Sequence, residues 1–316
     1  GLSDGIYFFN ATAFDNVSNT NSTETRNVTI DTINPQVQFV SPTEANNSFL
    51  SRNNILANVT ATDTNLANIT IRLFNTTGLV QTNISGTSPL FINFTSLADG
   101  VYFLNATAND TAGNSNKTET RTITIDTTKP LVQFVTPTDT NASFVNRNFI
   151  LVNITSTDAN LANITIRLFN STLSLINSTN STTSPLFVNF TGLSDGVYYF
   201  NATAFDSALN SNNTETRTVT IDTVNPLVQF VSPTEASGTF INRTNILINV
   251  TASDTNLANI TIRLFNSTFS LINSTNSTTS PLFANFTNLA DGIYFFNATA
   301  FDNVSNTNST ETRNVT

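Results

Sequence analysis

Apolar and polar residues alternate along most of this chain, in short runs separated by clusters of Asn, Ser, Asp and Gly. A two-residue period is typical of half-buried β-strands, because successive side chains of a strand point to opposite faces. In residues 128–223 the pattern predicts seven strands: Leu131–Thr136, Ile150–Thr155, Ala162–Phe169, Leu173–Ile176, Pro185–Phe190, Val197–Asp206 and Thr216–Ile221. Seven short strands in about 96 residues indicate a two-sheet β-sandwich.

The same pattern recurs along the chain with a period of about 95 to 96 residues, the length of a whole small domain. Its landmarks are the dipeptide Asp-Gly, starting at residues 4, 99, 195 and 291, and the tetrapeptide Thr-Ile-Asp-Thr, starting at 29, 124 and 220. We therefore divide the chain into four segments: 1–31, the last two strands of a repeat; 32–127 and 128–223, two full repeats; and 224–316, a third that lacks only its last few residues. Residues 4–29 are identical to residues 291–316, which indicates a window on a longer array.

A tyrosine opens the sixth predicted strand of each repeat, directly after the Asp-Gly turn: Tyr7, Tyr102, Tyr198 and Tyr294. This placement is typical of the tyrosine corner of immunoglobulin-like sandwiches, in which the hydroxyl bonds to upstream backbone. The predicted fold class is all-β, with tandem seven-stranded immunoglobulin-like β-sandwiches arranged end to end. An odd number of strands sends the chain in at one pole and out at the other. The linkers are about six residues long and contain a proline, so we expect a stiff rod.

Three motifs resemble the tandem immunoglobulin-like repeats of bacterial and archaeal cell-surface proteins, adhesins and extracellular filaments. They are Thr-Ile-Asp-Thr-Thr-Lys-Pro (124–130), Asp-Gly-Val-Tyr (99–102) and Asn-Asp-Thr-Ala-Gly-Asn (109–114). The resemblance covers the whole chain at the level of its domains. It implies a secreted, surface-anchored stalk or filament, and the heavy use of Asn and Thr resembles archaeal more than bacterial members.

The surface is built from neutral polar groups, because 50 Asn, 57 Thr and 30 Ser accompany only 10% charged residues. The net charge of −9 argues against nucleic acid as a partner, since that would require clustered Lys and Arg. No apolar run approaches the roughly 18 residues of a membrane span. The composition thus predicts an extracellular chain whose partners are neighbouring repeats, a filament of further copies, or a carbohydrate or cell-surface ligand.

The chain offers few side chains for catalysis, because it contains no Cys, His, Met or Trp. Nucleophile–histidine mechanisms are excluded, and a glycosidase-like carboxylate pair is the one remaining option. The acids recur at the same places in every repeat, which is unlike a single active site. We therefore expect no enzyme and no organic cofactor.

The aspartates are candidate ligands of structural Ca²⁺. Alternating strand directions place the linker, the loop after the second strand and the loop after the sixth strand at one pole of each repeat. Three sets should converge there: Asp31, Asp63 and Asp110; Asp126, Asp158 and Asp206; and Asp222, Asp254 and Asp302. Asp99 and Asp195, in the Asp-Gly turns of the opposite pole, could approach from across a junction. Clustered carboxylates repel one another unless a cation intervenes, and oxygen cages suit Ca²⁺. The alternative is independent Asx turns.

N-glycosylation is a further expectation, because 33 Asn lie in Asn-X-Ser/Thr sequences where random order would give about 13. The candidates are Asn10, Asn58, Asn68, Asn93, Asn105, Asn153, Asn163, Asn177, Asn180, Asn189, Asn201, Asn249, Asn259, Asn273, Asn276, Asn285 and Asn297. Strand alternation alone explains part of this excess, because Asn and Thr at i and i+2 face water together. It does not explain sites in predicted loops, such as Asn177 and Asn180.

Two functional alternatives to a structural stalk stay open. A binding module would use a segment that differs between repeats, such as residues 76–85 against 171–179. A filament subunit could use residues 1–31 to complete a neighbouring molecule's sandwich. The Glu–Arg pairs at 24/26, 119/121, 215/217 and 311/313 are interpreted as solvated surface pairs.

Overall fold

The computed structural model describes all 316 residues and consists of thirty β-strands, with no helix. No segment of it is therefore a helix that could cross a membrane. The chain divides into two compact units. One comprises residues 1–130, 158–162 and 205–211, and the other comprises residues 131–157, 163–204 and 212–316. The predicted all-β class is confirmed.

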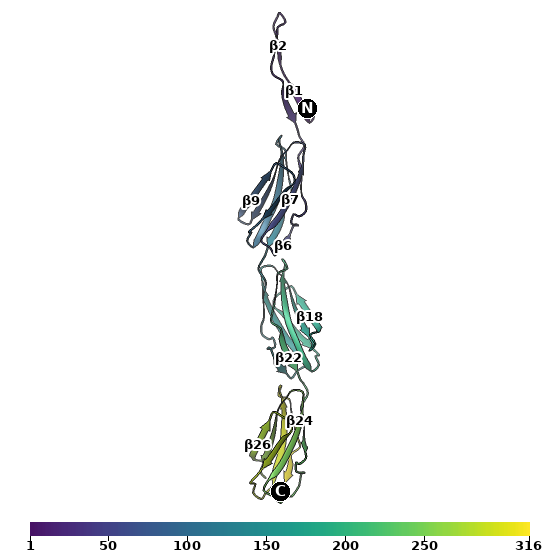
Figure 1. The fold of residues 1–316 in the computed structure, drawn as a ribbon, viewed down its shortest axis with the longest axis vertical. Coiled ribbons are helices and arrows are strands. Elements are labelled where there is room, and N and C mark those ends of the chain that lie inside the picture. Colours follow the sequence, from purple (N-terminus) through teal and green to yellow (C-terminus); the bar gives the residue numbers. More distant parts are fainter. The chain divides into compact units, whose positions relative to one another are not determined.

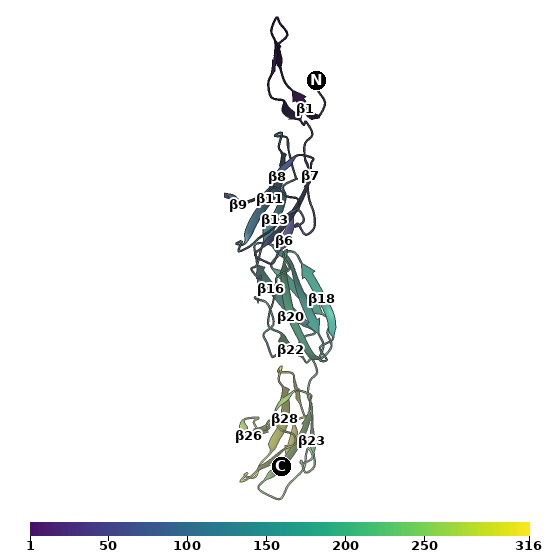
Figure 2. The same ribbon diagram turned by 45° about the horizontal axis from the view of Figure 1, so that its top comes forward.

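The first unit contains a pair of small two-stranded sheets and one complete sandwich (Figure 1). In residues 1–31, β1 (Gly5–Phe9) pairs with β4 (Arg26–Ile30), and β2 (Thr12–Phe14) pairs with β3 (Thr20–Ser22). The sandwich has β5 (Gln36–Phe39), β6 (Ser48–Leu50), β7 (Ile55–Thr62), β8 (Leu66–Asn75), β9 (Gly78–Ser85), β10 (Leu90–Phe94), β11 (Gly100–Asp110), β12 (Ser115–Lys117) and β13 (Arg121–Ile125). One sheet has the order β10-β7-β5 and the other β6-β13-β11-β8-β9, with β12 also on β11. Figure 2 shows β8, β11 and β13 side by side in the larger sheet.

Two further sandwiches have the same design: the third lies wholly in the second unit, and so does the second sandwich apart from residues 158–162 and 205–211. The second sandwich has β14 (Leu131–Phe134), β15 (Ser143–Val145), β16 (Phe149–Thr157), β17 (Leu161–Phe169), β18 (Leu175–Ser181), β19 (Leu186–Thr191), β20 (Gly196–Asp206), β21 (Ser211–Asn213) and β22 (Arg217–Ile221). The third sandwich has β23 (Leu227–Val231), β24 (Ile246–Ser253), β25 (Leu257–Phe265), β26 (Leu271–Ser277), β27 (Leu282–Phe286), β28 (Tyr294–Asp302), β29 (Thr307–Ser309) and β30 (Arg313–Val315). Their sheets run β14-β16-β19 with β15-β22-β20-β17-β18, and β23-β24-β27 with β26-β25-β28-β29.

The core of each sandwich follows directly from the alternation. On β7, for example, Ile55, Ala57 and Val59 are fully buried, and they pack with Ile69 and Leu73 of β8 from the facing sheet. Burying each large apolar side chain contributes about 1.5–3 kcal/mol relative to leaving it in water. Tandem immunoglobulin-like sandwiches, as predicted, are therefore confirmed.

The tyrosine corners are also confirmed. The Tyr102 hydroxyl donates to the carbonyl of Ala98 at 2.9 Å, and the Tyr198 hydroxyl donates to that of Ser194 at the same distance. Tyr7 and Tyr294 repeat the bond at 2.8 Å.

Two features of the strand pattern differ from the prediction for residues 128–223. Two strands of three residues, β15 and β21, were not predicted, and β15 pairs in parallel with β22. The predicted strand Leu173–Ile176 was wrong in its bounds, because Leu173 lies in a turn with φ +60° and β18 extends to Ser181. The second half of β18 is polar and lies at a sheet edge, where alternation is not needed to form a core.

Candidate metal centre in three aspartate clusters

Three clusters of aspartates lie where a linker meets two loops of a sandwich. In each cluster, one carboxylate oxygen from every member lies within 4.8 Å of the others. The members are Asp31, Asp63 and Asp110; Asp126, Asp158 and Asp206; and Asp222, Asp254 and Asp302. The structure thus places together the nine aspartates that strand direction predicted to converge, whereas their binding of Ca²⁺ stays a prediction.

The strands set the position of each carboxylate. In the second cluster, Asp126 follows β13 and belongs to the linker, Asp158 follows β16, and Asp206 is the last residue of β20. Asp126 and Asp206 are buried, and Asp158 is half-buried. The strands thereby hold these three carboxylates close to one another, and none of them forms an ion pair with Lys or Arg.

Two asparagines in each repeat hold these carboxylates, and the sequence analysis did not identify them. Asn160 donates its backbone N–H to Asp158 Oδ1 at 2.7 Å and its side-chain amide to Asp126 Oδ2 at 2.7 Å. Asn210 donates its side-chain amide to Asp206 Oδ2 and to the backbone carbonyl of Asp126, both at 2.7 Å. The signal in the sequence is the constant offset of two and four residues from the cluster aspartates, which recurs as Asn65 and Asn114 and as Asn256 and Asn306.

The pKa of the half-buried aspartate is raised in two clusters. Burial raises the pKa of Asp158, the N–H of Asn160 offsets part of this, and the charges of Asp126 and Asp206 raise it further. Asp254 has a raised pKa for the same reasons, with Asp222 and Asp302 as the neighbouring charges. Burial is the main cause of both raised pKa values, and the two neighbouring carboxylates add to it.

In the first cluster, Asp110 at the end of β11 has a lowered pKa, in contrast to Asp158 and Asp254. Burial acts to raise the pKa of Asp110, but hydrogen bonds from the Asn114 side chain and from the backbone N–H groups of residues 112–114 outweigh it. The net pKa is lowered. Hydrogen bonds to the charged form therefore stabilise this carboxylate as an anion.

Asp99 and Asp195 are not brought into any cluster. Both oxygens of Asp99 accept hydrogen bonds from Thr127, at 2.9 and 3.0 Å, and Oδ2 also accepts from the Thr128 hydroxyl at 3.0 Å. Burial acts to raise the pKa of Asp99, but these threonine bonds outweigh it and lower the pKa. Asp195 bonds Thr223 in the same way. These two residues hold the end of the last strand and the start of the linker.

The cluster geometry fits a hard cation. Ca²⁺–oxygen bonds are about 2.3–2.6 Å long, so two ligands of one ion lie at most about 5 Å apart. The 4.8 Å limit within each cluster satisfies this condition. Oδ2 of Asp63, Asp158 and Asp254 accepts no hydrogen bond, which leaves one oxygen per cluster free for an ion.

The candidate glycosylation sites separate into two groups by exposure. Asn10, Asn93, Asn177, Asn180, Asn189, Asn273, Asn276 and Asn285 are exposed. Asn58, Asn68, Asn105, Asn153, Asn163, Asn201, Asn249, Asn259 and Asn297 are half-buried on strands.

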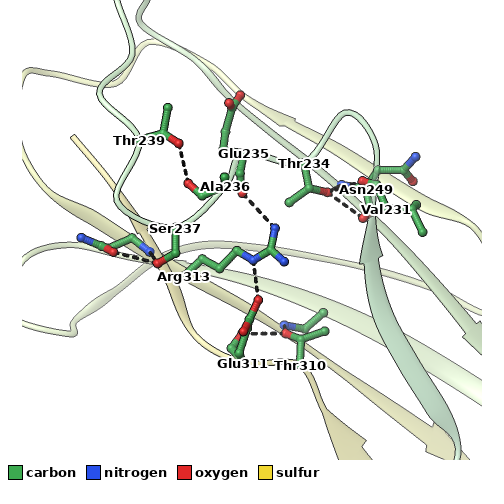
Figure 3. A network of polar contacts seen from close by, with 12 residues as sticks. Val231, Thr234, Glu235, Ala236, Ser237, Thr239, Asn249, Thr310, Glu311 and Arg313 are labelled. Carbon is green, nitrogen blue, oxygen red and sulfur yellow. Dashed lines mark hydrogen bonds and ion pairs between the residues drawn. The ribbon is translucent and has the colours of Figure 1, made fainter.

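The Glu–Arg pairs are not simple solvated pairs in the complete sandwiches. Arg313 bonds Glu311 at 2.7 Å and donates to the carbonyl of Glu235 at 3.1 Å (Figure 3). Its guanidinium also lies 4.6 Å over the ring of Phe230. Its side chain is only 23% exposed, whereas Arg26 in residues 1–31 is 69% exposed. The prediction was therefore right for the glutamates and for Arg26, and wrong for the arginines of the complete sandwiches. It failed because the aromatic partner lies about 80 residues away in the sequence.

The fold and the repeated clusters define a tandem array of immunoglobulin-like β-sandwiches. Residues 42–127, which cover most of the first complete sandwich, match the model of a family described as bacterial Ig-like domain. The resemblance to immunoglobulin-like repeats is thereby confirmed. No curated protein matches the chain.

Several solved structures resemble the chain at low sequence identity. Fibronectin(III)-like modules of Clostridium thermocellum CbhA are 17% identical over 59% of this chain and 93% of that chain, with a TM-score of 0.34. Domains A168–A170 of titin are 11% identical over 89% of this chain and 97% of that chain, with a TM-score of 0.37. A chain in a structure that concerns host cell surface retention of a 1.5-MDa bacterial ice-binding adhesin is 14% identical over 90% of this chain and 98% of that chain, with a TM-score of 0.35.

Proposed function

We propose that this chain is a structural section of an extracellular surface stalk, adhesin shaft or filament. It is N-glycosylated and stiffened at its linkers by Ca²⁺. The observation that carries the proposal is that each linker is hydrogen-bonded to the repeat before it and to the repeat after it. A spacer needs this property, because a linker without such bonds would act as a flexible tether.

The linker at Asp126 shows these bonds within the first unit. On one side, the Asp126 N–H donates to the carbonyl of Leu50 at 2.9 Å, and Thr127 bonds Asp99. On the other side, Asn160 and Asn210 bond the carboxylate and the carbonyl of Asp126. Ordering these residues costs conformational entropy, which the bonds offset.

The linker at Asp222 repeats the arrangement within the second unit. The Asp222 N–H donates to the carbonyl of Val145 at 3.1 Å. Asn256 donates to its carboxylate at 2.7 Å, and Asn306 donates to its carbonyl at 3.1 Å. The same chemistry at two linkers supports a role that every repeat shares.

Ca²⁺ would add to this arrangement by joining the linker carboxylate to two loop carboxylates of the following repeat. It would neutralise carboxylates whose burial and mutual repulsion raise the pKa of Asp158 and Asp254. The acids serve this purpose in every repeat, so we infer a structural and not a catalytic role for them.

Small-angle scattering on chains with one to three complete repeats tests the proposal. If the repeats form a shaft, each added repeat lengthens the particle by about 35–40 Å, the length of its eleven-residue strands. EGTA should broaden the distribution of dimensions. A maximum dimension that does not grow with repeat number would refute the stalk.

A filament subunit is a second candidate, in which residues 1–31 would complete the sandwich of another molecule. Phe9 is 56% exposed, whereas its counterpart Phe296 is fully buried, and Val28 and Val315 differ in the same way. These side chains need the remaining strands of a sandwich. A preceding segment of the same protein or another molecule can supply them, and electron microscopy of native material distinguishes single threads from polymers.

A binding module is a third candidate, for a carbohydrate or a cell-surface ligand. The first sandwich differs from the others at β9, where the exposed Ile84 occupies the register position of Asn180 and Asn276. A glycan-array screen of the three-repeat chain, with residues 76–85 replaced by residues 171–181 as control, tests it.

A further inference from the structure

We propose that N-linked glycans on the outer edge strands of the second and third sandwiches cover an apolar, unpaired sheet edge and prevent association between chains. The inference rests on the glycosylated stalk proposed above. It adds which asparagines carry the sugar and what the sugar does.

The edge concerned is formed by one strand of each sheet. β18 and β26 each end the larger sheet of their sandwich, and β19 and β27 each end the smaller one. The outer backbone groups of an edge strand are unpaired and form a template for pairing with another chain.

Exposed apolar side chains lie on these strands. Leu175 is 54% exposed and Phe187 is 51% exposed, with Ile176 between them in sequence. Leu271, Ile272 and Phe283 repeat the set in the third sandwich. Such strands promote association unless something blocks them.

The usual charged protection of an edge is absent. No Asp, Glu, Lys or Arg occurs between Arg167 and Asp195, or between Arg263 and Asp291. Natural edge strands commonly carry Lys or other charges that prevent pairing. The sequence instead places acceptor sites for N-glycosylation there.

These acceptor sites are accessible. Asn177 and Asn180 on β18, and Asn276 on β26, are exposed, and their side chains make no hydrogen bond. Asn285 on β27 only accepts, from Asn245 at 2.9 Å, so its Nδ2 is free. Asn189 and Asn273 are exposed as well.

The acceptor sites in the sheet interiors are different. Asn153 donates Nδ2 to the carbonyl of Thr136 at 2.8 Å, and its Oδ1 is buried. Asn163 donates Nδ2 to Thr165 and Asn201 donates Nδ2 to Thr216, at 3.3 and 3.2 Å. A sugar on Nδ2 would compete with these bonds and would need space that half-buried residues lack.

The attachment is a transfer of a glycosyl group from a lipid-linked phosphate donor. The bond from sugar C1 to the phosphate oxygen breaks and leaves its electron pair on that oxygen. A bond from C1 to Nδ2 forms, and Nδ2 loses one proton to water. The free amides on the edge strands can enter a transferase site without losing a hydrogen bond.

The first sandwich offers an internal comparison. Its edge strand β9 has one acceptor sequence, at Asn83, whose Nδ2 is buried. Asn93 on β10 is exposed, with its Oδ1 accepting from Asn54. We therefore expect sugar on β10 and none on β9.

The experiment combines glycopeptide mapping with sedimentation velocity, on the full chain secreted by a host that N-glycosylates. We expect sugar at Asn177, Asn180, Asn189, Asn273, Asn276 and Asn285. A variant with Gln at these six positions should self-associate with rising concentration, while the glycosylated parent stays monomeric. The matched control carries Gln at Asn153, Asn163 and Asn201, and should keep its sugar mass and stay monomeric.

Sugar mainly at the sheet-interior positions would overturn the inference, as would an edge variant that stays monomeric. Thermal unfolding of each variant separates association of folded chains from misfolding. The stalk proposal is judged independently by scattering dimensions. A chain with no sugar at the edge but a length that grows with repeat number would refute only this inference.

Discussion

The guanidinium of Arg217 lies 4.3 Å over the ring of Phe134 and thereby joins the last strand of one sheet to the first strand of the other. The same side chain bonds Glu215 at 2.8 Å and donates to the carbonyl of Asp139 at 3.2 Å. Arg121 over Phe39 and Arg313 over Phe230 repeat the contact, at 4.5 and 4.6 Å. Each complete sandwich is therefore closed along this side by one arginine.

Replacing Arg217 should destabilise its sandwich. Arg217→Ala removes a cation–π contact of about 0.5–2 kcal/mol and a hydrogen bond of about 1 kcal/mol. We expect a loss of about 2 kcal/mol in the free energy of unfolding, measured by urea denaturation. Glu215→Ala is the control, because its carboxylate is 59% exposed and such pairs contribute about 0–1 kcal/mol. An equal effect of the two variants would contradict a stacking role for the arginine.

The sequence predicted the long strands, the tyrosine corners and the meeting of the aspartates, because each follows from alternation and strand direction. It could not predict β15, because a strand of three residues is too short to show the alternation of apolar and polar side chains. Its pairing is determined by the partner strand β22. The sequence analysis also missed the burial of Arg217, because an Arg two residues after a Glu is equally compatible with a solvated face. The contact with Phe134 requires the register between two sheets, which local sequence does not contain.

The asparagines of the aspartate clusters were missed for a different reason. Asn160 and Asn210 are two among 50 Asn residues, and the sequence around each is typical of any loop. Only the fold shows that both donate to Asp126, from loops that are about 50 residues apart.

The tyrosine corner predicts a selective effect of removing one hydroxyl. Tyr198→Phe leaves the carbonyl of Ser194 without its donor, and we expect a loss of about 1–2 kcal/mol in the free energy of unfolding. Tyr199→Phe is the matched control, because its hydroxyl makes no hydrogen bond and points to the other face of β20. Urea denaturation of both variants checks the difference, and comparable losses would show that the corner bond contributes nothing specific.

Calcium should stabilise the chain against heat. A ligand that binds only the folded state stabilises it by about 2.7 kcal/mol when present at 100 times its dissociation constant. We therefore expect Ca²⁺ to raise the unfolding midpoint and EGTA to reverse the increase, as measured by calorimetry. Asp291→Asn should respond like the parent, because this exposed carboxylate belongs to no cluster. A midpoint that Ca²⁺ does not move would leave the clusters as networks of Asx turns.

The charge of Asp158 should affect stability in opposite directions with and without Ca²⁺. Its pKa is raised above the ordinary 3.8 by burial and by Asp126 and Asp206. The folded state therefore binds the proton more tightly than the unfolded state. This group's contribution to stability is complete below the ordinary pKa and is lost as the pH rises through the folded value.

Asp158→Asn mimics the protonated form at every pH while still accepting from the N–H of Asn160. In EGTA at pH 7 the variant should be more stable than the parent, because one of three like charges is gone. The advantage should fade as the pH falls through the raised pKa of folded Asp158 and be absent below about 3.8, where the parent is protonated in both states. In Ca²⁺ at pH 7 the variant should instead be less stable, because it lacks a charged ligand. Unfolding midpoints of the two proteins under these three conditions check the reversal. A variant that is destabilised equally with Ca²⁺ and with EGTA would show that Asp158 acts through its hydrogen bond alone.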